Sequence, residues 1–478
     1  MEKPNIILIM CDDLGYGDTG FNGNEVIKTP YLDKMRDEGA RFTRFFAGGP
    51  VCSPTRGTCL TGRHYFRYGV THANRGRLPT QEITLPEVCK EHGYSTGHFG
   101  KWHLGTMTTD ISDSNRGGPD HTEEYSPPWL HGFDRCFTSE AKVPTWDPMI
   151  TPDQTRANKY VWGEPGTFFG TRYWNEEGSP VSDNLDGANP RVIVDRVDPF
   201  IRNSAENNDP FLAVVWFHTP HAPVVAGPQY KDMYSQYSEE EQHYYGCVTA
   251  MDEQVGRLNQ LVKDLNIEDN TIIWFCSDNG PEGGEDLSGN GRSRGITGGL
   301  RGRKRSLFNG GVGVPALVKW PNVVEPGSEY NMPCSTLDYF PTLIDLLEYQ
   351  MPDERPIDGE SLLPLLRGKR NERRKPIPYR FLDRHDAMFG APTFALMDGK
   401  YKYLTNLSED GSEDMLFDLD ADMTESKNII EENRGRTAEM RKYLEDFLES
   451  CRKSHYGGDY PEPYEPVNQF QDSVGTWP

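Results

Sequence analysis

The chain has 478 residues, of which 35% are hydrophobic and 11% aromatic, enough to bury a large core and to form one large domain with a smaller one. The formal net charge of -23 argues against a nucleic-acid partner, because a polyphosphate would be repelled at long range unless a local basic patch overcame the field. The nine cysteines are scattered singly, with no Cys-x-x-Cys pair, so neither a zinc site nor a disulfide scaffold is predicted.

No membrane partner is expected, because no apolar stretch approaches the roughly 20 residues that cross a bilayer. The apolar run at residues 6–11 is also too short for the core of a signal peptide with its cleavage site. The sequence is consistent with a mature form whose export signal has been replaced by a start codon. We therefore expect a periplasmic or extracellular location for the native protein.

Three continuous apolar runs are predicted to be buried strands, and a polar cluster follows each of them. The runs span residues 6–10, 211–217 and 271–276. Helices are predicted between them, at residues 30–39, 85–92 and 239–265. This alternation predicts an α/β fold with a mostly parallel sheet between helices. Ligands in such folds bind beyond the carboxyl ends of the strands, so the polar clusters should meet there.

Two further regions differ from this pattern. Residues 106–190 are rich in Asp, Pro, Gly, Trp and Tyr with little periodicity, which predicts a long insertion beside the substrate. A charged, Pro-rich segment at 355–378 marks a boundary between predicted domains 1–370 and 371–478. In the second domain, a small antiparallel sheet and one helix are predicted from short alternating strands at 393–397, 401–405 and 415–418 and a helical pattern at 436–451.

The most specific segment is Cys52-Ser53-Pro54-Thr55-Arg56, followed by Leu60-Thr61-Gly62-Arg63. Ser53 is predicted to cap a helix that ends near Gly62, and Pro54 is predicted to lie in its first turn. The positive end of this helix would then face Cys52 and favour an anion there. The alternative is that Cys52 is a buried structural residue.

Oxygen ligands follow two of the predicted strands. Asp12 and Asp13 follow the first, and Asp278 and Asn279 follow the third. Their hard oxygen atoms suit Ca²⁺ or Mg²⁺ better than zinc. A helix cap or a turn is the alternative for either pair alone, but the occurrence of both pairs on predicted neighbouring strands favours a metal site.

Taken with Gly100-Lys101-Trp102-His103, His218-Thr219-Pro220-His221 and Gly302-Arg303-Lys304, the Cys52 segment resembles the signatures of the type I, formylglycine-dependent sulfatase family. The sequence departs from the family pattern at Asn309, where Glu is usual, and at Gly313, where Arg is usual. The resemblance covers roughly the first 350 residues. It implies an alkaline-phosphatase-like fold, with a large mixed, mostly parallel sheet sandwiched by helices and a smaller C-terminal sheet and helix.

The resemblance also implies a mechanism. Cys52 would be converted to formylglycine by a formylglycine-generating or anaerobic sulfatase-maturating enzyme, and would hold Ca²⁺, with Mg²⁺ as the alternative, together with Asp12, Asp13, Asp278 and Asn279. The other implied catalytic roles are sulfate binding by Arg56 and Lys101, proton removal by His103, and assistance to the leaving oxygen by His221 and Lys304.

The expected substrate is a sulfated oligosaccharide or polysaccharide. Trp102, His218, Arg384 and His385 are candidates to contact it, because aromatic faces stack on sugar rings and basic side chains bind hydroxyl or sulfate groups. His218 has the alternative of a hydrogen-bonded residue at a strand end. Five arginines would attract an anion to the crevice or, alternatively, form solvated loop charges: Arg292, Arg294, Arg301, Arg303 and Arg305.

Two other functions compete with sulfate ester hydrolysis. One is a phosphatase or phosphonate monoester hydrolase of the same superfamily. A two-zinc phosphatase would need additional His ligands near Asp278, and the sequence has none there. The other is an inactive carbohydrate-binding homologue in which Cys52 stays unmodified.

Overall fold

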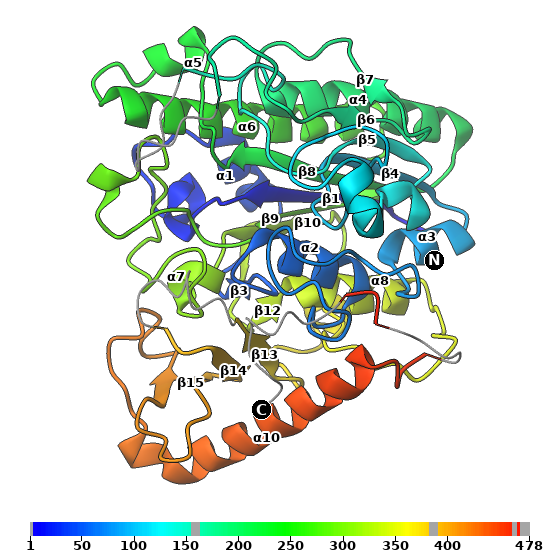
Figure 1. Ribbon diagram of the computed structural model, residues 1–478. Coiled ribbons are helices and arrows are strands. Elements are labelled where there is room, and N and C mark those ends of the chain that lie inside the picture. Colours follow the sequence, from blue (N-terminus) through cyan, green and yellow to red (C-terminus); the bar gives the residue numbers. More distant parts are fainter. Residues whose placement is uncertain (1–2, 154–162, 382–390, 461–465, 469–478) are drawn as a thin grey trace.

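The computed structural model describes residues 3–153, 163–381, 391–460 and 466–468. A ten-stranded sheet runs through it in the order β11-β2-β10-β9-β1-β8-β4-β5-β6-β7 (Figure 1). β1 (Asn5–Asp12) pairs in parallel with β8 (Phe211–Pro220) on one side and β9 (Thr271–Ser277) on the other. β4 (Ser95–Lys101) continues the parallel part between β8 and β5 (Arg135–Ser139). The predicted mostly parallel sheet is thus confirmed.

The two margins of this sheet are mixed. On one margin, β10 (Ala316–Lys319) is antiparallel to β9 and to β2 (Ala40–Phe42), and β11 (Ser328–Tyr330) is parallel to β2. On the other, β6 (Tyr173–Trp174) and β7 (Pro180–Val181) follow β5 in antiparallel order. β5, β6 and β7 all come from the predicted insertion, so part of that segment extends the sheet instead of forming only loops.

Helices cover both faces of the sheet because its central strand is apolar on both sides. In β1, Ile6, Leu8 and Met10 pack in one buried cluster, and Ile7, Ile9 and Cys11 pack in the other. This alternation follows from the two-residue period of a strand. Figure 1 shows α1 (Pro30–Glu38), α4 (Asn189–Asn207) and α6 (Glu239–Asp264) on one face. On the other face lie α2 (Cys52–Thr61), α3 (Leu85–Glu91) and α8 (Tyr339–Leu346).

Shorter elements complete this larger unit. β3 (Phe45–Phe46) pairs in parallel with β12 (Cys334–Ser335) as a separate two-stranded sheet. The short helices are α5 (Pro228–Asp232), α7 (Asn309–Val312) and α9 (Leu363–Leu366). None of the helices in the described part of the chain combines the length and apolarity that a bilayer span requires.

The C-terminal unit is a four-stranded antiparallel sheet with one long helix, as the sequence predicts. Its strands are β13 (Ile377–Arg380), β14 (Phe394–Asp398), β15 (Tyr401–Thr405) and β16 (Met415–Asp418), and its helix is α10 (Arg434–His455). The predicted boundary at residue 370 falls between α9 and β13. Leu444 and Leu448 of α10 nevertheless belong to the same buried cluster as residues of α2 and α8, so the two units share a core.

Candidate active site

Two pairs of oxygen ligands meet at the carboxyl edge of the sheet. Asp12 ends β1, and Cys11 stands opposite Ser277 in β9, so Asp13 lies next to Asp278 and Asn279. The Asp13 amide donates to Asp278 Oδ1 at 3.2 Å, and Asn279 Nδ2 donates to Asp13 Oδ1 at 2.7 Å. All are buried. The structure therefore brings together the residues that the sequence singles out as metal ligands.

Helix α2 places Cys52 at the carboxyl edge of the sheet, beside these ligands. The helix begins at Cys52 and ends at Thr61, and the next residue, Gly62, caps it with a left-handed φ of 65°. The prediction that Ser53 caps it is wrong: Ser53 lies inside the first turn, and its hydroxyl donates to the His103 carbonyl at 2.7 Å. Cys52 Sγ lies 3.2 Å from Asp12 Oδ1. Burial, reinforced by Asp12, raises the pKa of the Cys52 thiol well above its usual value, so the unmodified thiol is a poor nucleophile.

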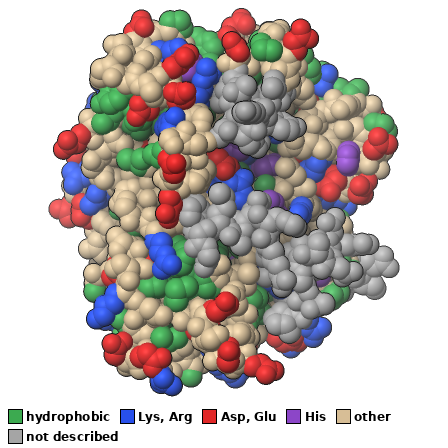
Figure 2. All heavy atoms as spheres, turned by 60° about the vertical axis from the view of Figure 1, so that its left-hand side comes forward, with side chains coloured by type: hydrophobic (Ala, Val, Ile, Leu, Met, Phe, Trp, Pro, Cys, Tyr) green, Lys and Arg blue, Asp and Glu red, His purple; other side chains and the backbone are tan. Residues whose placement is uncertain are grey.

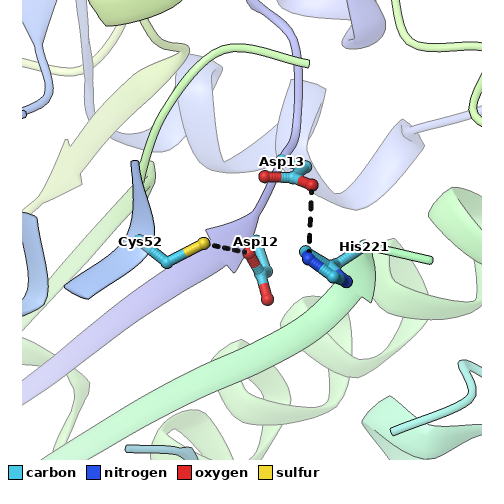
Figure 3. Close-up of side chains that lie close together, drawn as sticks. All are labelled: Asp12, Asp13, Cys52 and His221. Atoms are coloured by element: carbon cyan, nitrogen blue, oxygen red, sulfur yellow. Dashed lines mark hydrogen bonds and ion pairs between the residues drawn. The ribbon is translucent and has the colours of Figure 1, made fainter. Parts of the chain in front are cut away.

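These residues fit a hard divalent cation. One ligand atom from each of Asp12, Asp13, Cys52 and His221 lies within 4.8 Å of the others (Figure 3). Asn279 Oδ1 is buried without a hydrogen-bond partner among the described residues, as expected of an oxygen reserved for a cation. Burial, together with the neighbouring Asp12 charge, raises the pKa of Asp13 to about 7. A divalent cation would relieve this repulsion between carboxylates.

Three buried cations surround the carboxylates. Lys101, at the end of β4, lies 2.6 Å from Asp12, and Lys304 lies 2.7 Å from Asp13. Arg56, one turn into α2, donates to Asp278 at 2.7 Å. Although burial opposes charging, these carboxylates raise the pKa of both lysines, which stay protonated.

The charges of this cluster are balanced. Three carboxylates (Asp12, Asp13 and Asp278) face three cations (Arg56, Lys101 and Lys304), so their formal sum is zero. A bound divalent cation would leave an excess of two positive charges. The cluster would then attract an anionic group into a dry environment, where electrostatic interactions are strong.

Two neutral histidines complete the cluster. In His221, Nδ1 lies 2.6 Å from the Ala222 carbonyl oxygen, so Nδ1 carries the proton and donates it. The other ring nitrogen, Nε2, is then unprotonated, and it lies 3.7 Å from the Asp13 carboxylate. His103 has a left-handed φ of 60°, a strained conformation that is often found at functional sites. Its Nδ1 is buried without a hydrogen-bond partner among the described residues. Burial lowers the pKa of both rings well below the usual value, so they are neutral.

Of the four residues expected to contact the substrate, the two that the structure describes are buried in the protein interior. Trp102 has no exposed surface, and its indole donates to the Ser126 carbonyl at 2.7 Å, so its expected contact is corrected to a packing role. His218 is also fully buried, with Nε2 2.7 Å from Ser139 Oγ, which corresponds to the alternative of a hydrogen-bonded strand end. Arg384 and His385 lie outside the described residues.

A pocket of about 170 Å³ opens beside the cluster. Cys52, Lys101, His103, His221 and Lys304 line it. Figure 2 is turned so that the carboxyl edge of the sheet comes forward, and it shows Lys, Arg and His side chains gathered in a hollow on this face. The lining also includes loop residues that carry no sequence motif and were not predicted: His72, Asn74, Asn115, Lys142 and Glu282.

The arginine cluster has mainly structural contacts. Of the five arginines, Arg305 lines the pocket, where it pairs with Glu282 at 2.6 Å. Arg303 is buried and donates to the Gly295 carbonyl at 2.5 Å, and the Arg301 guanidinium lies 3.8 Å from the centre of the Phe308 ring. Attraction of an anion by the whole cluster is therefore not supported, whereas Arg305 is placed to contribute to it.

The departure from the family pattern at Asn309 has a structural partner in the C-terminal unit. The backbone N–H of Asn309 donates to Glu425 Oε2 at 2.6 Å. The side-chain oxygen of Asn309 accepts from Lys402 Nζ at 2.7 Å. Lys402 and Glu425 are both fully buried and form an ion pair at 2.8 Å. Glu425 thus supplies a carboxylate at the start of α7, five residues beyond Lys304.

A cluster able to hold a cation, a buried cysteine and several cationic groups at the carboxyl edge of a doubly wound sheet are the arrangement expected of a hydrolase of anionic esters. The family model described as Sulfatase matches residues 4–349, and the one described as N-sulphoglucosamine sulphohydrolase, C-terminal, matches residues 302–454. The chain therefore belongs to the sulfatase family: it is a sulfuric ester hydrolase with the alkaline-phosphatase-like fold.

Individual relatives agree with this assignment. Steryl-sulfatase of Homo sapiens is 30% identical over 424 residues, covering 77% of this chain and 70% of that protein. N-acetylgalactosamine-6-sulfatase of Homo sapiens is 32% identical over 401 residues, covering 79% of this chain and 68% of that protein. Among solved structures, Ps i-CgsB in complex with k-i-k-neocarrahexaose superposes with a TM-score of 0.76 at 26% identity, covering 93% of each chain.

Proposed function

We propose that this sulfatase removes sulfate from a sulfated oligosaccharide or polysaccharide, with a formylglycine made from Cys52 and with bound Ca²⁺. The observation that carries the proposal is the position of Cys52, 3.2 Å from Asp12 within a buried set of oxygen ligands and cations. A carbohydrate substrate is supported by the similarity to N-acetylgalactosamine-6-sulfatase and to Ps i-CgsB, which was solved with a neocarrahexaose.

Asp12, Asp13, Asp278 and Asn279 would hold the cation, together with the modified Cys52. The cation supplies Lewis-acid stabilisation of negative charge on the sulfuryl oxygens. Lys101 and Arg56 neutralise charge at the same oxygens from β4 and α2, and both are held in place by carboxylates.

The proton transfers fall to the remaining side chains. The formylglycine hydrate would supply the oxygen that attacks sulfur, already deprotonated because a divalent cation lowers the pKa of a hydroxyl bound to it. Lys304, with His221 beside it, would protonate the sugar oxygen as its bond to sulfur breaks. His103 would take the proton of the second hydroxyl through Nδ1, which would allow the bond between carbon and the sulfate oxygen to break, sulfate to leave and the aldehyde to be restored.

Modification of Cys52 is tested by mass spectrometry of its tryptic peptide from protein produced with a maturating enzyme. Conversion of CH₂SH to CHO lowers the mass by about 18 units. Protein produced without the maturating enzyme, and the Cys52→Ala variant, are the controls. A modified peptide with full activity supports the proposal, whereas an unmodified peptide in an active preparation overturns the role of formylglycine.

The substrate class is tested with a panel of defined sulfated saccharides, an aryl sulfate and the matching aryl phosphate. We expect turnover of at least one saccharide and a preference for the aryl sulfate over the aryl phosphate. Activity confined to the aryl sulfate would contradict a role in carbohydrate degradation. Faster turnover of the aryl phosphate would favour the phosphatase alternative, and no turnover together with an unmodified Cys52 in protein produced with the maturating enzyme would favour the inactive homologue.

A further inference from the structure

A chain of polar side chains connects His103 to Lys142 at the rim of the pocket. His103 Nε2 lies 2.7 Å from Asn74 Oδ1, Asn115 Nδ2 donates to the same oxygen at 3.0 Å, and Lys142 Nζ donates to Asn115 Oδ1 at 3.3 Å. The four residues come from four different segments of the chain, and all four line the pocket.

The chemistry of these groups fixes the direction of every hydrogen bond. A lysine ammonium can only donate, so Asn115 must present its carbonyl oxygen to Lys142 and its amide NH₂ to Asn74. Asn74 must then present its oxygen, because two NH₂ groups cannot bond to each other. An amide oxygen only accepts, so His103 Nε2 must carry the ring proton.

From this network we infer that Lys142, Asn115 and Asn74 form a relay that fixes the tautomer of His103, with the proton on Nε2 and an unprotonated Nδ1. His103 Nδ1 is buried and makes no hydrogen bond to the described residues, so its lone pair stays available. The relay residues are positioning residues that act through His103. Their effect on catalysis rests on the proposed role of His103 as proton acceptor, but the tautomer itself does not.

The surrounding scaffold holds the relay together. Arg116 is buried and donates to Glu140 Oε1 at 2.8 Å and to the Gly76 carbonyl at 2.7 Å, which ties the loop of Asn115 to the loop of Asn74. The His103 amide donates to the Glu140 carbonyl at 2.8 Å. Asn74 itself has a left-handed φ of 63°, which Asn tolerates better than most residues.

Two isosteric substitutions separate this inference from a simple charge effect. Asn115→Asp leaves only acceptor oxygens at residue 115, so Asn74 must turn its NH₂ toward both neighbours, and His103 Nε2 must become the acceptor. The ring proton then moves to Nδ1. Asn74→Asp adds the same negative charge nearby but keeps an acceptor against Nε2, so the proton stays on Nε2.

The experiment is nitrogen-15 NMR of protein labelled at the histidine rings, recorded without substrate at about pH 8, with the His103 signals assigned from their loss in His103→Gln. We expect the Nε2–H form in the wild type, in Asn74→Asp and in Lys142→Arg, and the Nδ1–H form in Asn115→Asp. Unchanged signals from the other histidines show that each variant is folded. An Nδ1–H wild type, or an Nε2–H form in Asn115→Asp, overturns the inference.

Activity gives a second readout on protein with modified Cys52. Because a general base contributes about 10²-fold or more, Asn115→Asp should lower kcat on an aryl sulfate by about that factor. A rise in KM with unchanged kcat and tautomer would show that these residues only bind substrate, which contradicts the relay. Loss of the Nε2–H form without loss of kcat would leave the tautomer relay intact and refute the catalytic role of His103.

Discussion

Replacement of Arg56 by Met is expected to destabilise the protein by about 3–5 kcal/mol when divalent cations are removed. The Arg56 guanidinium is fully buried, donates to Asp278 Oδ2 at 2.7 Å and to the Lys101 carbonyl at 3.0 Å, and lies 5.1 Å from the centre of the Trp216 ring. At that 2.7 Å separation, with an effective dielectric constant of about 20, the attraction between the charges is roughly 6 kcal/mol. The cost of burying the guanidinium offsets part of it.

The measurement is urea unfolding followed by tryptophan fluorescence, in EDTA and in Ca²⁺. Added Ca²⁺ should reduce the effect, because the cation replaces part of the lost positive charge beside Asp278. Burial already holds the pKa of Asp278 above its usual value, and loss of Arg56 would raise it further. The variant should therefore lose stability relative to the wild type as the pH rises through the raised pKa that Asp278 has in the folded wild type, which lies above the value of about 4 of the unfolded carboxyl.

The matched control is Arg36→Met. Arg36 lies 2.9 Å from Asp37, but both side chains are substantially exposed. Replacement of Arg36 should therefore lower the free energy of unfolding by less than about 1 kcal/mol. If Arg56→Met is no more destabilising than this control in EDTA, Asp278 does not depend on Arg56 for its charge, and the reasoning about buried charge balance is refuted.

Three further outcomes are expected. Lys304→Ala should lower kcat by about 10²-fold on a sulfated sugar and by less on an aryl sulfate, because an aryl oxide needs less protonation; equal losses would contradict its role at the leaving oxygen. Ca²⁺ at about 100 times its Kd should raise the free energy of unfolding by about 2.7 kcal/mol, and the rise should be absent in Asp13→Ala. Lys402→Met should lower the free energy of unfolding, measured by urea unfolding, by about 3–5 kcal/mol, because Glu425 is left buried without its partner at 2.8 Å. The double variant Lys402→Met with Glu425→Gln should recover part of that loss.

The regular elements that the sequence predicts well are those with strong local signals. β15 and β16 match their predicted ranges, and α6 begins at the predicted residue because Ser238 accepts from the Glu241 amide in a capping box. Helix α4 was not predicted: Pro199 lies within it and weakens the local helical signal, although its apolar residues recur at helical spacing. β6 and β7 have two residues each, too few to show any periodicity.

The residues of the candidate site also include some that the sequence predicts and some that it does not. Residues at strand ends, such as Asp12 and Asp278, were predictable because the carboxyl ends of parallel strands meet. Asn74 and Asn115 were not, because they lie in loops that are brought together by a contact between residues distant in the sequence, Arg116 and the Gly76 carbonyl. The cap at Ser53 was predicted two residues too late, since Cys52 begins the helix and Val51 precedes it as the capping residue.

The contact between Asn309 and the pair of Lys402 and Glu425 limits how this enzyme can be divided or recombined. A fragment ending at residue 370 would lose both partners of Asn309, and the segment that leads from Lys304 into α7 would lose its anchor. An exchange of C-terminal units between relatives would have to carry a compatible residue at 309. The smaller unit and the catalytic loop should therefore be exchanged together, and substitutions at residues 309, 402 and 425 should be tested in combination.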